Sequence, residues 1–236
     1  MSSYFHTNET TISDFSPNFI DEMYEKGYVF TRISKGVMQQ TRSVRIDLSK
    51  FELSSENRRI IKKTDGLSLF VHQIPFVVYD WHIGKMAKDF YSAKFGNQVM
   101  SAQKIKEMLT DATKSNWNSV LAYSFTESAD TALHTTTLGD SKSTGYTICY
   151  LSNNIIHYSY PFYSLTLSSK DFGLGMMLRA ILFAKESGLK YVYLGSLQRP
   201  TDTYKLQFAG LEWFDGSTWS NDLENVKSIL VNVSKE

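Results

Sequence analysis

Residues 170–195, KDFGLGMMLRAILFAKESGLKYVYLG, give the first indication of the fold of this chain. It contains a glycine-bearing turn, an amphipathic helix that Gly188 ends, and an apolar strand typical of a buried sheet. Glycines let backbone N–H groups approach an anion closely, and the start of the helix adds unpaired donors and a favourable dipole. The turn therefore suits a phosphate, either of coenzyme A or of another phosphate-rich acyl donor. A turn that only packs the helix against a sheet has the same pattern.

Patterns of strands and helices surround this stretch. Before it, the runs SVLAYSF, TALHTTTL, YTICYL and IIHYSY, joined by short polar connectors, predict an antiparallel meander. Further strands are predicted over residues 27–33, 42–48 and 67–74, and helices over residues 16–26 and 54–64 and near residues 81–116. After it, residues 201–210 predict a short helix, residues 211–216 a strand with a turn, and residues 219–233 a last helix or helix–strand pair.

The composition excludes several classes of protein. The chain has 236 residues, a net charge of +1 and a single cysteine, Cys149, which excludes an internal disulfide framework or a multi-cysteine metal site within it. The polar first 15 residues and the absence of any run of about 18 apolar residues favour a cytoplasmic protein without a membrane partner. We expect a polar tail over residues 1–15 and a single domain over residues 16–236, with the helical segment near 81–116 inside it.

Three places in the sequence carry a resemblance to a known fold. Residues 170–175 have the spacing basic, x, x, Gly, x, Gly; the helix that follows has one apolar side; and TYKLQFAGLEW looks like a late helix that contributes a tyrosine near the leaving group. In this order they resemble the GCN5-related acyltransferase fold. The resemblance implies an α+β protein with a mixed sheet flanked by helices.

Longer segments narrow the resemblance. RSVRIDLSKFELSSENRRIIKKT, SYPFYSLTLSSKDFGLGMML and KYVYLGSLQRPTDTYKLQFAGLEWFDG are similar in order and spacing to segments of the arginyl-tRNA–protein transferase family, including its bacterial leucyl-transferring relatives. The resemblance implies transfer of an amino acid from an aminoacyl-tRNA to the N-terminal amine of a protein, which marks it for degradation. Family members usually carry a cysteine cluster that binds an iron–sulfur cluster or zinc; here no cysteine precedes Arg42.

The predicted helix over residues 54–64 has a basic side. Taking 100° per residue from Arg58, the four cations span about 140°, while Ile60 and Ile61 lie on the other side. These cations are Arg58, Arg59, Lys62 and Lys63. Such a row of cations is typical of an ordinary solvated helix face. It is also what a surface that binds the phosphate backbone of tRNA needs. Asn57, next to them, would contact sugar or base edges.

Two further groups of candidate residues follow from the resemblance and from the place of ligands in such folds. Lys170, Gly173 and Gly175 would receive the terminal phosphates of the tRNA acceptor end. Ligands gather at the carboxyl ends of central strands, and the residues predicted there are Tyr193, Gly195, Tyr204, Lys205 and Gln207. Lys205 would stabilise an oxyanion or bind a phosphate, Tyr204 or Tyr193 would donate a proton, and Gln207 would orient ribose hydroxyls.

Other features leave alternatives open. Tyr160 and Tyr163 fit core packing, or stacking on the terminal adenine. The acceptor amine needs a carboxylate, for which the sequence offers Asp47, Asp80, Asp171 and Glu212 without choosing among them. Histidine spacing predicts no metal site, and we expect no cofactor besides aminoacyl-tRNA as co-substrate. The alternatives are an acetyl-coenzyme A-dependent N-acetyltransferase and a non-catalytic module that binds tRNA or peptide. We expect a monomer.

Overall fold

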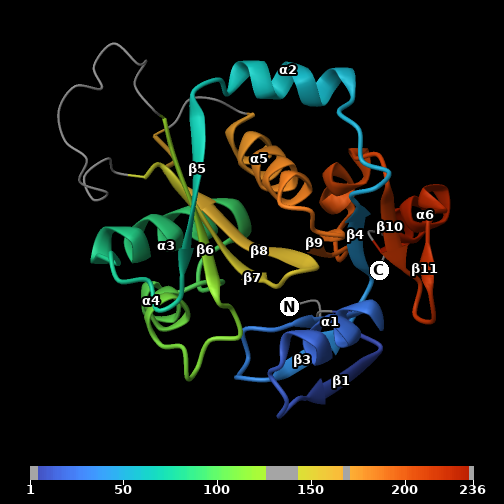
Figure 1. Cartoon of the computed structure of the whole chain (residues 1–236), viewed down its shortest axis with the longest axis horizontal. Helices are drawn as coiled ribbons and strands as arrows, with labels where there is room; N and C mark the ends of the chain where they lie inside the picture. Colours follow the sequence, from blue (N-terminus) through green and yellow to red (C-terminus); the bar gives the residue numbers. More distant parts are fainter. Residues whose placement is uncertain (1–4, 126–142, 167–170, 234–236) are drawn as a thin grey trace. The chain divides into compact units, whose positions relative to one another are not determined.

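The computed structural model describes residues 5–125, 143–166 and 171–233 (Figure 1). The chain forms two compact units. Residues 1–54, 150–159 and 184–236 form unit 1, and residues 55–149 and 160–183 form unit 2. The single domain that the sequence predicts over residues 16–236 stays a prediction. The two units interleave along the chain, so no composition change or linker marks their boundary.

The sheet of unit 1 has the strand order β11-β10-β4-β9-β8. Its strands are β4 (Ser43–Asp47), β8 (Ile155–Tyr163), β9 (Tyr191–Ser196), β10 (Leu211–Phe214) and β11 (Trp219–Ser220), with only the first half of β8 in this unit. β8 pairs with β9 in parallel, whereas the pairs β9–β4, β4–β10 and β10–β11 are antiparallel. The sheet is therefore mixed, and with the helices around it the expected α+β class is confirmed.

A second, antiparallel sheet of unit 1 has the order β1-β3-β2, with β1 (Asn8–Thr11), β3 (Val37–Gln40) and β2 (Tyr28–Phe30). The strand predicted over residues 27–33 is confirmed in shorter form. β1 lies inside the segment that the sequence predicts as a tail. Its polar residues pair through the backbone with β3, in the register Asn8 to Gln40, so that no apolar alternation announces it.

Helix α1 (Pro17–Glu25) shows why its sequence folds locally as it does. Pro17 occupies the first turn, where its missing N–H costs nothing, and Ile20, Met23 and Tyr24 are buried. Gly27 follows with a φ of +81°, and a Cβ there would lie 2.4 Å from the ring of Phe214. Only glycine fits this position. Unit 1 also contains the 3-10 helix η2 (Pro200–Gln207) and α6 (Leu223–Val233), which contacts η2 and β10.

Unit 2 contains α2 (Ser55–Lys63), β5 (Leu67–Gln73), α3 (Trp81–Phe95), α4 (Ala102–Thr110), β6 (Ser119–Phe125), most of β7 (Gly145–Leu151), the end of β8 and most of α5 (Phe172–Glu186). β5, β6 and β7 are successive antiparallel strands. β6 and β7 belong to the predicted meander, and β5 corresponds to the separate strand predicted over residues 67–74. The strand predicted for TALHTTTL lies outside the described residues. α3 packs against α4. None of the described helices has the length and apolarity needed to cross a membrane.

Candidate functional site

The end of β9 carries an irregularity that turns the chain. Between β4 and β9 the register passes from Arg45–Tyr193 to Ser43–Ser196, so β9 has one residue more than its partner strand. Gly195 lies in this bulge with a φ of +78°, a conformation that glycine adopts without strain. The N–H of Leu197 then donates to the carbonyl of Arg42 at 2.9 Å. Bulges of this kind redirect side chains at a strand end.

Lys205 on η2 is buried beside this bulge. Only 9% of the residue is exposed, and its Nζ donates to the carbonyl of Ser196 at 2.8 Å. No carboxylate within the described ranges forms an ion pair with Lys205. Burial lowers the pKa of its ammonium, because a low-dielectric environment disfavours the charged form. An incoming anion would meet a buried cation that forms no ion pair in the described ranges, although the charge of Asp202 acts to raise its pKa and that of Arg199 to lower it.

The start of η2 is fixed by a capping arrangement. The backbone N–H groups of Gln198 and Arg199 both donate to Oδ2 of Asp202, at 2.8 and 2.9 Å. Tyr204 and Gln207 lie on the same short helix as Lys205. Tyr204 is 49% exposed, and Gln207 donates its Nε2 to the carbonyl of Tyr204 at 2.6 Å. η2 thus presents three of the predicted residues together, and their roles stay predictions.

Tyr193 requires a correction. Its side chain is only 1% exposed, and its hydroxyl accepts a hydrogen bond from Nη1 of Arg45 at 3.3 Å. Burial raises the pKa of this hydroxyl. A proton donor to a substrate has to reach the substrate, so Tyr193 is a core residue and not the predicted catalytic acid. Gly195 provides the positive φ angle in the bulge of β9.

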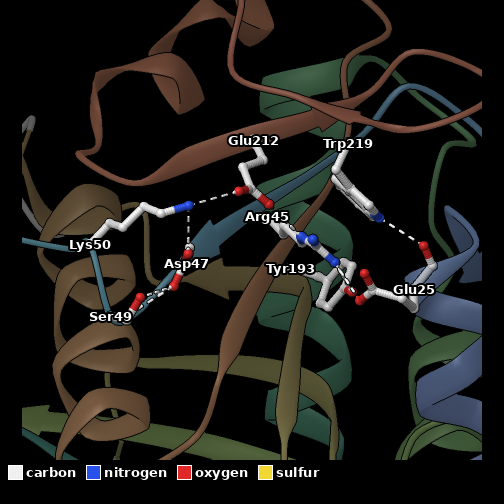
Figure 2. Close-up of polar contacts among 8 residues, drawn as sticks. All are labelled: Glu25, Arg45, Asp47, Ser49, Lys50, Tyr193, Glu212 and Trp219. Atoms are coloured by element: carbon white, nitrogen blue, oxygen red, sulfur yellow. Dashed lines mark hydrogen bonds and ion pairs between the residues drawn. The ribbon is translucent and has the colours of Figure 1, made fainter.

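Arg45 is a buried residue that the sequence analysis did not single out (Figure 2). Its Nε donates to Oε2 of Glu212 at 2.9 Å and its Nη1 donates to Oε2 of Glu25 at 2.6 Å. The guanidinium lies 3.9 and 4.0 Å from the ring centroids of Tyr191 and Trp219. The only sequence signal for its burial is an arginine within an apolar strand pattern. Its partners could not be predicted, because they are distant in the chain. Arg45 connects β4, β9, β10 and α1.

The four carboxylates left open as receptors for an amine already have partners. Glu212 accepts from Arg45 and also pairs with Lys50 at 3.3 Å, and Lys50 pairs with Asp47 at 2.9 Å (Figure 2). Asp80 caps α3 by accepting from the N–H of His82 at 2.6 Å. Asp171 pairs with cations of α2, described below. None of the four is a dedicated receptor for an amine.

His157 lies in the core of unit 1. Its Nδ1 is 2.8 Å from the hydroxyl of Tyr24, and a Cβ placed on Gly195 would lie 3.9 Å from its Nε2. Burial, with a contribution from the charge of Lys205, lowers the pKa of His157 to about 3. The imidazole is therefore neutral at pH 7.

The basic side of α2 in unit 2 is exposed, but half of its charge is compensated. Arg59 pairs with Glu56, and Arg59 and Lys63 pair with Asp171 at 3.4 and 3.1 Å. Arg58 and Lys62 have no ion pair with any residue in the described ranges. They are the cations of α2 that remain for a phosphate backbone.

Asn57 requires a second correction, because it is fully buried and cannot contact sugar or base edges. On the helical wheel it lies about 260° from Arg58, between Ile60 and Ile61, so the pattern itself placed it on the inner side.

The glycine turn has a packing role that the phosphate prediction missed. A Cβ on Gly175 would lie 2.6 Å from Cγ2 of Thr64, and a Cβ on Gly173 would lie 3.1 Å from the ring of Tyr163. These glycines let α5 approach α2 and β8 closely. Asp171, directly before α5, is itself an anion at this helix start, which disfavours a phosphate there. The glycines are therefore better explained by packing than as a phosphate cradle. Lys170 lies outside the described residues.

Two tyrosines of unit 2 pack against other rings. The ring centroid of Tyr160 lies 5.0 Å from that of Trp117, and the centroid of Tyr163 lies 4.7 Å from Phe90 and 5.1 Å from Phe172. Both side chains are half-buried. Packing explains these contacts, and stacking on adenine stays a prediction.

Comparison with known proteins decides the family. A family model described as arginine-tRNA-protein transferase, C terminus, matches residues 82–215, which is more than half of the chain. The chain belongs to this family. It is 26% identical over 211 residues to an aspartate/glutamate leucyltransferase of Alkalilimnicola ehrlichii, covering 86% of this chain and 82% of that protein. Over 62 residues it is 42% identical to an aspartate/glutamate leucyltransferase of Ruegeria pomeroyi, covering 25% of this chain and 23% of that protein. The family that the sequence predicts is confirmed.

Solved structures show more distant similarities to this arginine-tRNA-protein transferase family member. L-PGS from Bacillus licheniformis aligns with a TM-score of 0.44 at 12% identity, over 92% of this chain and 69% of that chain. The GCN5-related glucosamine N-acetyltransferase region of a fungal multi-domain β-N-acetylglucosaminidase aligns with a TM-score of 0.42 at 8% identity, over 86% and 22%.

The residues of this family member do not fit an iron–sulfur cluster or a cysteine-bound zinc. Such groups need several thiolates, and the chain has only Cys149, which is buried in β7. Within the part of the chain that the structure describes, no group of three or more histidines, cysteines and carboxylates is placed to hold a metal.

Proposed function

We propose that this chain transfers an amino acid from an aminoacyl-tRNA to the N-terminal amine of a protein or peptide. The family assignment supports this proposal, as does the relative named aspartate/glutamate leucyltransferase, of which the chain covers 82%. The structural observation that carries it is Lys205, a buried ammonium without a carboxylate partner among the described residues, at the end of β9.

The reaction needs little beyond positioning and charge stabilisation. The lone pair of a neutral amine attacks the carbonyl carbon of the aminoacyl ester, and an amide bond forms as the bond to the ribose oxygen breaks. Negative charge develops on the carbonyl oxygen in the transition state. The proton lost by the amine is balanced by the proton gained by the ribose oxygen, so no external oxidant or reductant is required.

Lys205 and Tyr204 fit the two polar roles in this reaction. Lys205 would stabilise the oxyanion, or bind the phosphate of the terminal adenosine, with the N–H groups not used by Ser196. Tyr204, half exposed on the same helix, would deliver a proton to the departing ribose oxygen. Arg58 and Lys62 of unit 2 would bind the tRNA backbone.

The names of the relatives supply the first substrates to test. They indicate leucine as the transferred amino acid and aspartate or glutamate as the first residue of the acceptor. We place this activity in the cytoplasm, in the modification of N-termini that marks proteins for degradation.

The test is an incubation of the purified chain with tRNA charged with labelled leucine or arginine and with peptides that begin with Asp, Glu or Ala. We expect label to move to an acidic peptide. Absence of transfer from either tRNA, together with no tRNA binding at low salt, would refute the proposal.

A thermal unfolding scan with coenzyme A distinguishes the proposed aminoacyltransferase from the alternative enzyme, an N-acetyltransferase. An N-acetyltransferase would be stabilised by coenzyme A through binding to the folded state, and we expect no such shift. Binding of tRNA without any transfer would instead identify a non-catalytic module.

A further inference from the structure

Arg42, the residue before β4, is a buried cation that the proposed mechanism does not use. Only 8% of it is exposed, and its Nε and Nη1 are buried without a hydrogen-bond partner. It forms no ion pair with any residue in the described ranges. Burying a guanidinium with unmet donors is costly, and a charge-assisted hydrogen bond to a carboxylate oxygen is the interaction that offsets this cost best. Arg42 is therefore prepared for an anion.

The chain's own Phe5 covers this guanidinium. The ring centroid of Phe5 lies 4.1 Å from Cζ of Arg42, while Phe5 itself stays 41% exposed. The contact adds a cation–π attraction but satisfies none of the buried N–H groups. An acidic side chain in the place of Phe5 would offer a carboxylate oxygen to this guanidinium.

Gln198 holds the main chain of Phe5 at two points. Its Oε1 accepts from the N–H of Phe5 at 2.9 Å, and its Nε2 donates to the carbonyl of Phe5 at 3.0 Å. The same Nε2 donates to Oγ of Ser196, which fixes the amide orientation. This pair of bonds recognises the backbone of one residue of an extended peptide and makes no use of its side chain. The neighbouring N–H of Leu197 donates to the carbonyl of Arg42, so the two recognition elements are adjacent.

We propose that Gln198 and Arg42 form the docking position for the first residue of an acidic acceptor peptide, and that Phe5 of this chain occupies that position in the structure. Gln198 binds the main chain of the residue, and Arg42 binds its carboxylate. A peptide fits this arrangement better than RNA, because the two bonds from Gln198 match a backbone N–H and C=O. This inference rests on the proposed function for the identity of the peptide.

The test measures peptide binding directly, without tRNA. A labelled ten-residue peptide that begins with Asp is titrated with the full chain by fluorescence anisotropy, beside a matched peptide that begins with Asn. Phe5→Ala removes the ring from Arg42 and leaves the internal segment only its two main-chain bonds to Gln198, so we expect weaker internal competition and about 3- to 10-fold tighter binding of the Asp peptide. Phe15→Ala is the matched control: Phe15 is 40% exposed and lies under Lys35, and its removal should change nothing.

Two further variants test the recognising side chains. We expect the wild type to prefer the Asp peptide by about tenfold, and Arg42→Met to abolish this preference. Arg42→Lys keeps the charge without the planar guanidinium and its several donors, and should retain only part of the preference. Gln198→Leu should weaken both peptides alike. Circular dichroism verifies the fold of each variant.

Several results would overturn the inference: no binding of either peptide at about 1 mM, no tightening in Phe5→Ala, or an unchanged Asp preference in folded Arg42→Met or Arg42→Lys. Failure of the proposed function gives a different result. A chain that binds the Asp peptide through Arg42 but transfers no amino acid retains the docking site and loses the activity. A chain that transfers with the same acceptor choice after Arg42→Met retains the activity and loses this docking site.

Discussion

Among the described residues, Arg45 is the most connected charged side chain in the sheet of unit 1. Its guanidinium lies 3.9 and 4.0 Å from two aromatic ring centroids and binds Glu25 and Glu212, with 5% of its side chain exposed. We expect Arg45→Met to lower the free energy of unfolding by about 3 kcal/mol, because Glu212 loses a buried partner. Lys50→Met is the control. Lys50 binds the same Glu212 but is 62% exposed, so its loss should cost less than about 1 kcal/mol in urea unfolding. Equal effects would contradict this assignment.

His157 makes stability depend on pH. Its pKa is about 3 in the folded chain and about 6.5 when unfolded, so between these values the unfolded chain binds a proton that the folded chain does not. Stability is therefore full above pH 6.5 and falls as the pH drops below it. We expect the melting temperature to fall between pH 7 and pH 5, and to fall less in His157→Gln. His82→Gln, at an exposed histidine, should keep the wild-type slope. An unchanged slope in His157→Gln would refute a neutral buried imidazole.

Among the elements of unit 2, α2 and α5 approach each other closely at Gly175. A Cβ on Gly175 would lie 2.6 Å from Thr64, while a Cβ on Gly173 would meet a more movable ring at 3.1 Å. Alanine stabilises a helix by about 1 kcal/mol over glycine. We nevertheless expect Gly175→Ala to destabilise by about 1 to 3 kcal/mol, and Gly173→Ala by less. Adding Thr64→Ala to Gly175→Ala should relieve the strain. In a double-mutant cycle, the two changes in the free energy of unfolding should therefore not be additive. A stabilised Gly175→Ala would contradict the packing role.

Local signals predicted most elements, and distant partners account for what was missed. Pro17 and Gly27 delimit α1 within a few residues, so the sequence alone predicted it. The sequence did not predict the strand β1, because it has no apolar alternation and forms only through its pairing with β3. At the site, Lys205 was predicted from the resemblance. Arg45 was not, because Glu212 is 167 residues away.

For the whole molecule, a net charge of +1 means that tRNA affinity depends on local charge. We expect Arg58→Gln with Lys62→Gln to reduce the slope of log affinity against log salt by about 1.5 to 2, since both cations lack ion pairs in the described part of the chain. Lys85→Gln with Lys88→Gln removes the same charge from α3 and should leave the slope unchanged. Asp171→Asn should raise affinity by releasing Lys63, while Arg59 keeps its ion pair with Glu56. Equal effects of the two double variants would argue against α2 as the tRNA surface.

We expect the proposed aminoacyl-tRNA-dependent transfer to depend on Lys205. This is tested by the rate at which labelled amino acid moves from charged tRNA to a peptide beginning with Asp, for the wild type, Lys205→Met and the exposed-lysine control Lys190→Met. We predict transfer by the wild type and by Lys190→Met, and a loss of about 100-fold in kcat for folded Lys205→Met. No transfer by the wild type would refute the proposed activity, and an unchanged rate in Lys205→Met would refute the role of Lys205 in it.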